Sequence, residues 1–252
     1  MALLEVSSVS KRFGGIVALD EVSLEVDERE AVGLVGPNGA GKTTLFDCVA
    51  GLVRPDAGNV VFAGERIDRL PPYRRARLGI GRTFQRLELF TGMTPLEHLL
   101  VTERVRAGSG KLWKDLVGLG RPTHDERREA HSLLELVGLS GLENDPVDSL
   151  SLGRGRLVEL ARALVGSPRL LMLDEPSSGL DEAERDALVG AVRRARADRG
   201  SAILMVEHDL ELVAAVVDRL VVLDSGRRIA DGPVGLVLGE RAVQEAYLGT
   251  AS

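Results

Sequence analysis

Short runs of apolar residues, bounded by turn residues, recur along the chain and predict the strands of a buried sheet. Four such runs cover residues 31–35, 170–173, 202–206 and 220–223. Runs that are apolar at successive positions are typical of strands covered on both faces, as in parallel sheets. Helical patterns separate the runs, so the sequence predicts a mostly parallel sheet in an α/β core.

The amino-terminal part of the chain shows a different pattern. Residues 3–9, 22–26 and 59–62 alternate between apolar and polar side chains or lie beside turns. Alternation of this kind is typical of antiparallel strands that expose one face. We therefore expect a small antiparallel sheet packed on the edge of the core.

The middle of the chain, from Thr94 to about Val165, has helical patterns and a loop-rich insertion near residues 108–122. We expect one domain over residues 1–252, built from two lobes. The α/β lobe comprises residues 1–93 and 166–225, the inserted helical lobe comprises residues 94–165, and residues 226–252 form a carboxy-terminal tail.

Composition and charge narrow the range of functions. The 252 residues carry 38 acidic and 32 basic side chains, for a formal net charge of −6, and only 3% are aromatic. An acidic balance argues against a broad phosphate-neutralising face, and few aromatic residues argue against a base-stacking platform. We therefore expect no nucleic acid partner.

The apolar runs and the cysteine content indicate the compartment. No run of about 18 uninterrupted apolar residues occurs, and residues 1–9 lack the basic and apolar regions of a secretory signal. Cys48 is the only cysteine, which excludes an internal disulfide framework and a multi-cysteine metal site. We expect a soluble protein of the reducing cytoplasm.

A glycine-rich segment directly after residues 31–35 satisfies the phosphate-binding P-loop pattern. It consists of Gly36, Pro37, Asn38, Gly39, Ala40, Gly41, Lys42 and Thr43, and Thr44 continues into a predicted helix. Glycines let backbone N–H groups converge on phosphate oxygens, and a helix N-terminus adds partial positive charge. We expect Lys42 to reach the β- and γ-phosphates and the Thr43 hydroxyl to coordinate Mg²⁺.

The apolar run 170–173 ends in two carboxylates, Asp174 and Glu175. In open α/β sheets, ligands bind at the carboxyl ends of the strands. Asp174 is therefore a candidate partner of Mg²⁺, either as a ligand or from just outside the ligand set. Glu175 is the candidate for polarising the water that attacks the γ-phosphate.

Further motifs distinguish among proteins that share a P-loop and an acidic strand end. They are Lys11-Arg12-Phe13, Arg82-Thr83-Phe84-Gln85, Leu150-Ser151-Leu152-Gly153, Ser178-Gly179-Leu180-Asp181 and Val206-Glu207-His208-Asp209. With these motifs in this order, the sequence resembles the nucleotide-binding subunits of ABC transporters nearly from end to end. The resemblance implies a P-loop NTPase, RecA-like core with an antiparallel β subdomain and an inserted helical subdomain.

The resemblance also implies a role for one residue of each motif. Phe13 would stack on adenine, and Gln85 would sense Mg²⁺ and the attacking water. His208 would contact the γ-phosphate, and Asp181 would belong to the D-loop. Ser151 and Gly153 would form the signature motif, ahead of a helix that begins near Arg156. Lys42, Gln85, Glu175 and His208 would together carry the hydrolysis.

Such subunits work in pairs, and the resemblance implies the same here. Each ATP would lie between the P-loop of one subunit and the signature motif of the other, in a head-to-tail dimer of two copies or of this chain with a related second ATPase. Two transmembrane permease subunits would be further partners and would hold the chain on the inner face of the cell membrane.

A closer subgroup also matches. Residues 82–85, 89–90, 93–94 and 97–100, together with the closing 246–249, resemble importers of branched-chain and related hydrophobic amino acids.

Two residues depart from the family pattern. Arg154 replaces the usual glutamine, and Gly155 stands where a helix-forming residue is expected. We therefore expect a working but altered ATPase.

Two other functions stay open at this point. One is a soluble ABC-type ATPase that acts outside transport, and the other is a weakly hydrolysing regulatory module, suggested only by Arg154 and Gly155.

Two remaining features have simpler interpretations. The basic run at residues 74–77 is interpreted as a solvated helix face, and Cys48 as a small buried hydrophobic side chain.

Overall fold

The structure is a computed structural model and describes residues 2–83, 87–106 and 122–248. Its main sheet has six strands in the order β10-β9-β3-β8-β7-β6. They are β3 (Ala31–Val35), β6 (Ile80–Arg82), β7 (Leu170–Asp174), β8 (Ala202–Val206), β9 (Arg219–Asp224) and β10 (Arg227–Pro233). All neighbours are parallel except β10, which runs antiparallel to β9.

A second sheet is antiparallel and has the order β2-β1-β4-β5. It comprises β1 (Ala2–Phe13), β2 (Ile16–Asp27), β4 (Ala57–Phe62) and β5 (Glu65–Arg66). This sheet and the main sheet together confirm the predicted α/β fold with a small antiparallel part.

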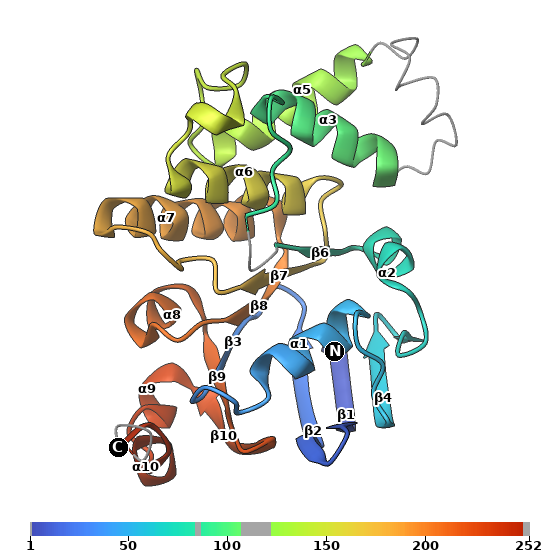
Figure 1. Ribbon diagram of the computed structural model, residues 1–252, viewed down its shortest axis with the longest axis vertical. Coiled ribbons are helices and arrows are strands. Elements are labelled where there is room, and N and C mark those ends of the chain that lie inside the picture. Colours follow the sequence, from blue (N-terminus) through green and yellow to red (C-terminus); the bar gives the residue numbers. More distant parts are fainter. Residues whose placement is uncertain (1, 84–86, 107–121, 249–252) are drawn as a thin grey trace.

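The helices follow in chain order from the P-loop segment to the carboxy-terminal region (Figure 1). They are α1 (Lys42–Ala50), α2 (Pro72–Leu78), α3 (Pro95–Arg106), α5 (His124–Leu136), α6 (Leu152–Leu164), α7 (Glu182–Arg199), α8 (Leu210–Val216), α9 (Val234–Val237) and α10 (Arg241–Leu248), with a 3₁₀ turn at Val147–Ser149. No helix within the described ranges combines the length and the apolar character needed to cross a bilayer.

Alternate residues of the main sheet point into two different cores. On one face, Val32 and Leu34 of β3 join Leu45 and Phe46 of α1 and side chains of the antiparallel sheet. On the other face, Ala31 and Val35 join side chains of the helices from α3 to α10. Both faces of β3 are therefore covered, as its unbroken apolar sequence predicts.

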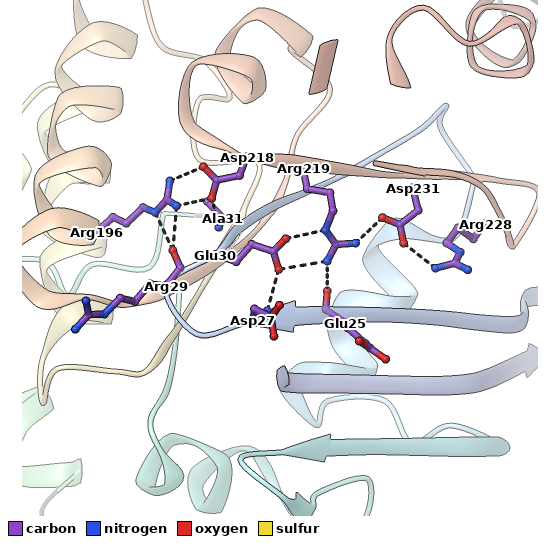
Figure 2. A network of polar contacts seen from close by, with 10 residues as sticks. All are labelled: Glu25, Asp27, Arg29, Glu30, Ala31, Arg196, Asp218, Arg219, Arg228 and Asp231. Atoms are coloured by element: carbon purple, nitrogen blue, oxygen red, sulfur yellow. Dashed lines mark hydrogen bonds and ion pairs between the residues drawn. The ribbon is translucent and has the colours of Figure 1, made fainter. Parts of the chain in front are cut away.

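Charged residues join the two sheets at the end where the parallel strands begin (Figure 2). Arg219, the first residue of β9, forms ion pairs with Glu30 and Asp231 and donates to the backbone oxygen of Glu25 in β2. The Glu30 carboxylate also accepts a bond from the Asp27 N–H at 2.8 Å. This network leaves the opposite end of the sheet, where the strands finish, for the candidate site.

One predicted boundary was wrong, and two strands of the main sheet were not predicted. The helix expected to begin near Arg156 begins at Leu152, and Ser151 is its N-cap. The short strand β6 was not predicted. Within the expected carboxy-terminal tail, β10 pairs with β9 and extends the main sheet.

Candidate nucleotide-binding site

The P-loop joins the buried strand β3 to α1, and two of its glycines have no possible replacement. Gly36 has φ 143°, and a Cβ there would lie 2.0 Å from the Leu223 oxygen. Gly41 has φ 101°, and a Cβ there would lie 2.5 Å from the Ala18 oxygen. The loop therefore takes a conformation and a close backbone approach that only glycine allows.

Lys42, the first residue of α1, folds back over the P-loop. Its Nζ donates to the Gly36 oxygen at 2.6 Å and to the Pro37 oxygen at 2.9 Å, and the residue is buried. Burial lowers the pKa of Lys42, while the nearby Glu175 opposes that change. The ammonium thus lies beside the loop that the sequence assigns to phosphates and within electrostatic reach of Glu175.

Asp174, the last residue of β7, is the strongest candidate for a metal partner among the described residues. Burial and the neighbouring Glu175 raise its pKa to about 6. Among the residues that the structure describes, its Oδ1 is buried without a hydrogen-bond partner, so this acceptor can receive a cation. Thr43, on the first turn of α1, is exposed and can supply a hydroxyl oxygen. The predicted Gln85 lies outside the described residues.

We expect Asp174→Asn to stabilise the unliganded fold at neutral pH. Because the pKa of Asp174 is raised from 3.8 to about 6 in the folded state, the folded protein holds this proton more tightly than the unfolded chain does. The bound proton stabilises the folded wild-type protein fully below the unfolded-state pKa, and this contribution is lost as pH rises through the folded-state pKa. The total loss in the free energy of unfolding is roughly 3 kcal/mol.

Urea unfolding at a series of pH values checks this expectation. The free energies of unfolding of wild type and Asp174→Asn should agree at the acid end and diverge as pH approaches about 6, with the variant more stable above it. Asp198→Asn, which changes an exposed residue of α7, serves as the control. Equal stabilities of wild type and Asp174→Asn at every pH would contradict the raised pKa.

Glu175 follows Asp174 in a strained backbone conformation. Its φ is 43°, in the left-handed region that a non-glycine residue rarely adopts. The Glu175 N–H donates to the Val206 oxygen at 2.9 Å, and its oxygen accepts from the Ser178 N–H at 3.2 Å. Strain that is held in place by such bonds is typical of functional sites.

His208 lies just after β8, and its side chain is 60% exposed. The preceding Glu207 is completely buried, and its Oε2 lies 3.6 Å from His208 Nδ1. Sequence reasoning missed Glu207. The available signal was a charged residue that directly follows an unbroken apolar strand, where burial is expected.

The signature residues form a second group, at the amino ends of α6 and α7. The exposed Ser151 caps α6 and accepts from the Arg154 N–H at 3.3 Å. The Gly153 N–H donates to Glu184 Oε1 at 3.1 Å, and a Cβ on Gly153 would lie 2.4 Å from the Glu184 carboxyl carbon. Asp181 caps α7 and accepts from the Glu184 N–H at 2.8 Å. Glu184 therefore joins the signature motif to the D-loop.

The two departures in the signature motif lie in the first turn of α6. Arg154 is exposed, and Gly155 is buried against Leu87, whose Cδ2 lies 2.9 Å from the position of an added Cβ. Gly155 therefore makes room for a side chain from the segment after residues 84–86. The Gly155 N–H donates to the Ser151 oxygen at 2.9 Å, so the residue takes part in the helix, where glycine costs roughly 1 kcal/mol relative to alanine.

Phe13, the last residue of β1, presents an exposed ring. The residue is 48% exposed, and Lys11 Nζ lies 5.3 Å from the centroid of its ring. Lys11 also forms an ion pair with Asp56 at 2.8 Å. The exposed ring can therefore contact a planar ligand, with the Lys11 cation over one of its faces.

The basic run at residues 74–77 is not a wholly solvated face, because Arg75 is buried. Its Nη1 donates to the Cys48 and Val49 oxygens at 2.7 Å, and its Nε donates to the Leu70 oxygen at 2.9 Å. Arg75 thus caps the carboxyl end of α1.

Cys48 is the small buried side chain that the sequence predicts. It is buried, and burial raises its thiol pKa to about 11.

Comparison with known proteins identifies the family. The family model described as ABC transporter matches residues 19–178, which include the P-loop and both carboxylates. The chain is 38% identical to the high-affinity branched-chain amino acid transport ATP-binding protein BraF of Pseudomonas aeruginosa, over 99% of this chain and 98% of BraF. It is 37% identical to the corresponding LivG of Escherichia coli, with the same coverage.

Other relatives carry different names. The lipopolysaccharide export system ATP-binding protein LptB of Haemophilus influenzae is 36% identical over 99% of this chain and 98% of LptB. Among solved structures, the ADP conformation of MJ1267, an ATP-binding cassette of an ABC transporter, superposes with a TM-score of 0.87 at 33% identity, over 99% of both chains. We conclude that the chain belongs to the ABC transporter family and is one of its nucleotide-binding ATPases.

Proposed function

We propose that the chain is the ATP-hydrolysing motor subunit of an importer for branched-chain or related amino acids. The observation that carries this proposal is the identity of 38% to BraF and 37% to LivG over nearly the whole chain, slightly above the 36% to LptB at the same coverage. The subgroup motifs around residues 82–100 and 246–249 favour the same assignment.

For ATP hydrolysis, we propose a role for each of the predicted site residues. The P-loop amides and Lys42 bind the phosphates, and the Phe13 ring stacks on adenine. Glu175 accepts a proton from the attacking water, and its bonded backbone fixes the direction of its side chain. His208 contacts the γ-phosphate from the end of β8.

We further propose that Mg²⁺ accompanies the nucleotide. Thr43 and Asp174 would hold it, together with Gln85, which the sequence predicts as a further member of the site. Asp174 Oδ1, which has no hydrogen-bond partner within the described ranges, fits that role. When bound, the ion supplies positive charge to the phosphate oxygens. Within the described ranges no group of three or more acidic, histidine or cysteine side chains could hold a metal. In this proposal the phosphate oxygens of the nucleotide would supply the remaining ligands.

We propose that the signature residues act on the nucleotide of a second subunit. Ser151 offers an exposed hydroxyl at the amino end of α6, where the helix dipole favours phosphate. The Gly153 N–H donates to Glu184 here and would exchange that carboxylate for phosphate when the second subunit docks. ATP would then join two subunits head to tail, and its hydrolysis would remove the γ-phosphate that both contact. The difference in contacts between ATP and ADP would shift the pair between closed and open states.

We propose that a groove between the lobes receives a permease subunit. The groove has a volume of about 410 Å³ and lies between α2, β6, α3 and α6. Exposed apolar side chains line it, including Tyr73, Phe90, Val101 and Val105. Its charged lining residues are Arg77, Arg82, Arg106, Arg162 and Glu159. The excess of arginines favours a cytoplasmic permease segment with apolar side chains and at least one acidic residue.

Val105→Glu should weaken this contact while the ATPase activity of the isolated chain stays unchanged. A carboxylate on α3 places charge on the apolar part of the groove, and its desolvation opposes docking. Co-purification with the permease subunits from detergent should fall about 10-fold or more, as for loss of a central interface residue. Leu236→Glu, at an exposed leucine of α9 outside the groove, is the control. Undiminished co-purification of Val105→Glu would contradict the assigned groove.

ATP-driven uptake in vesicles that contain both permease subunits tests the overall function. We expect accumulation of labelled leucine that depends on ATP and on this chain. ATP-dependent extraction of lipopolysaccharide in place of leucine uptake would overturn the importer assignment. ATPase activity with no association with any permease would favour a soluble non-transport ATPase, and nucleotide binding without turnover would favour a regulatory module.

A further inference from the structure

Glu207 is a fully buried carboxylate between two loops of the candidate site. It follows the last residue of β8 and precedes His208. Its side chain is 0% exposed. Burying an acidic side chain costs free energy unless hydrogen bonds compensate for its lost hydration. The hydrogen-bond partners of Glu207 therefore indicate its role.

Each carboxylate oxygen of Glu207 serves a different loop. Oε1 accepts from the Ser177 N–H at 2.9 Å and from the Ser177 hydroxyl at 2.6 Å. Oε2 accepts from the His208 N–H at 3.1 Å and lies 3.6 Å from His208 Nδ1. Glu207 is thus a two-sided bridge between the loop after β7 and the loop after β8.

The next residue along the chain strengthens the same connection. Asp209 caps α8 and forms an ion pair with Arg185 of α7 at 3.1 Å. His208 is therefore flanked by two acidic residues that are each bonded to the segment between β7 and the first turns of α7. Its own side chain remains exposed, so the anchoring acts on the backbone and leaves the imidazole accessible.

We propose that Glu207 is a positioning residue for hydrolysis, which holds the backbone of His208 in register with the loop that follows Glu175. The proposal rests on the role proposed above for His208. Ser177 is the anchor, because it is buried in the loop that carries Glu175 at one end and Asp181 at the other. Glu207 transmits that anchor to His208, so that the histidine and the general base keep a fixed separation.

The bridge requires a carboxylate at position 207. Both loops present backbone N–H groups to it, and only a carboxylate has acceptors on both oxygens. In Glu207→Gln, one end of the side chain becomes an NH₂ group that faces an N–H donor. The amide has nearly the same size, so the substitution removes one side of the bridge with little change in packing.

The test is a double-mutant cycle of Glu207→Gln with His208→Ala. We expect Glu207→Gln to lower kcat about 10-fold while KM for ATP changes less than about twofold, because a misplaced His208 affects the reacting state more than the bound state. His208→Ala should lower kcat at least as much. The double variant should match His208→Ala alone, because residues that act through one another are not additive.

The control is Glu30→Gln, which disrupts another bridging carboxylate, in the network of Figure 2. It should lower the unfolding temperature without changing kcat. Should Glu207→Gln fail to fold, Ser177→Ala removes only the 2.6 Å bond and should lower kcat a few-fold at unchanged KM.

The outcomes separate the two assignments. If His208→Ala lowers kcat and Glu207→Gln lowers it further by its full single-variant factor, Glu207 does not act through His208 and this proposal is overturned alone. If His208→Ala has wild-type kcat, the proposed role of His208 fails and the positioning role fails with it. An unchanged kcat in folded Glu207→Gln also overturns the proposal.

Discussion

Lys42→Ala is expected to abolish ATP binding at micromolar nucleotide. Lys42 Nζ already lies over the P-loop, where it donates to the Gly36 and Pro37 oxygens. A charge-assisted bond to phosphate is stronger than these neutral contacts, so the ammonium is expected to transfer from the loop carbonyls to the nucleotide. Loss of that cation from a buried site should weaken binding at least about 100-fold, as for removal of one member of a buried charged pair.

Titration with a fluorescent ATP analogue measures this effect. Lys11→Ala is the matched control, because Lys11 is another lysine near the site that pairs with Asp56. It should reduce affinity only modestly, through the loss of a cation beside the Phe13 ring. Circular dichroism checks whether the Lys42→Ala variant is folded. If a folded Lys42→Ala protein bound ATP with wild-type affinity, the assignment of Lys42 to the phosphate site would be wrong.

Glu175→Gln is expected to preserve ATP binding and to lower turnover by about 10²–10⁴-fold, the range for loss of a general base. The amide keeps the size of the side chain, and the backbone bonds from Glu175 to Val206 and Ser178 do not depend on the carboxylate. The left-handed backbone should therefore stay in place. With ATP bound and hydrolysis blocked, the proposed head-to-tail pair should accumulate.

Phosphate release measures turnover, and size-exclusion chromatography with light scattering measures the pair. The pair should form with ATP in the Glu175→Gln variant and dissociate when ATP is removed. Glu182→Gln is the control, because Glu182 is an exposed acidic residue in the first turn of α7. Full ATPase activity in Glu175→Gln would show that another group accepts the proton.

Most of the core could be predicted from sequence because apolar runs report burial directly. The predicted runs 31–35 and 202–206 coincide with β3 and β8, and the run 170–173 is one residue shorter than β7. The strands β6 and β10 escaped prediction for a physical reason. β6 has three residues, and β10 is a polar edge strand, so neither shows the continuous apolar pattern of a buried strand.

The site could be predicted only where a motif records its chemistry. The P-loop pattern and the acidic end of β7 point to the residues that the structure brings together around Lys42. The start of α6 was misplaced because glycines at positions 153 and 155 have low helix propensity, whereas packing against Glu184 and Leu87 fixes that turn. Glu207 and Arg75 were missed because their partners are distant in sequence, and burial of a charged side chain depends on such partners.

The buried Arg75 also affects the electric potential at the P-loop. α1 has nine residues, so its carbonyl end lies only about 14 Å from its amino end. The partial negative charge of the carbonyl end would weaken the positive potential that the amino end offers to an anion. Arg75 places a full positive charge on those carbonyls, in an interior that screens charge poorly. The short helix therefore presents a more positive amino end than its own dipole provides, through a cation at its opposite end.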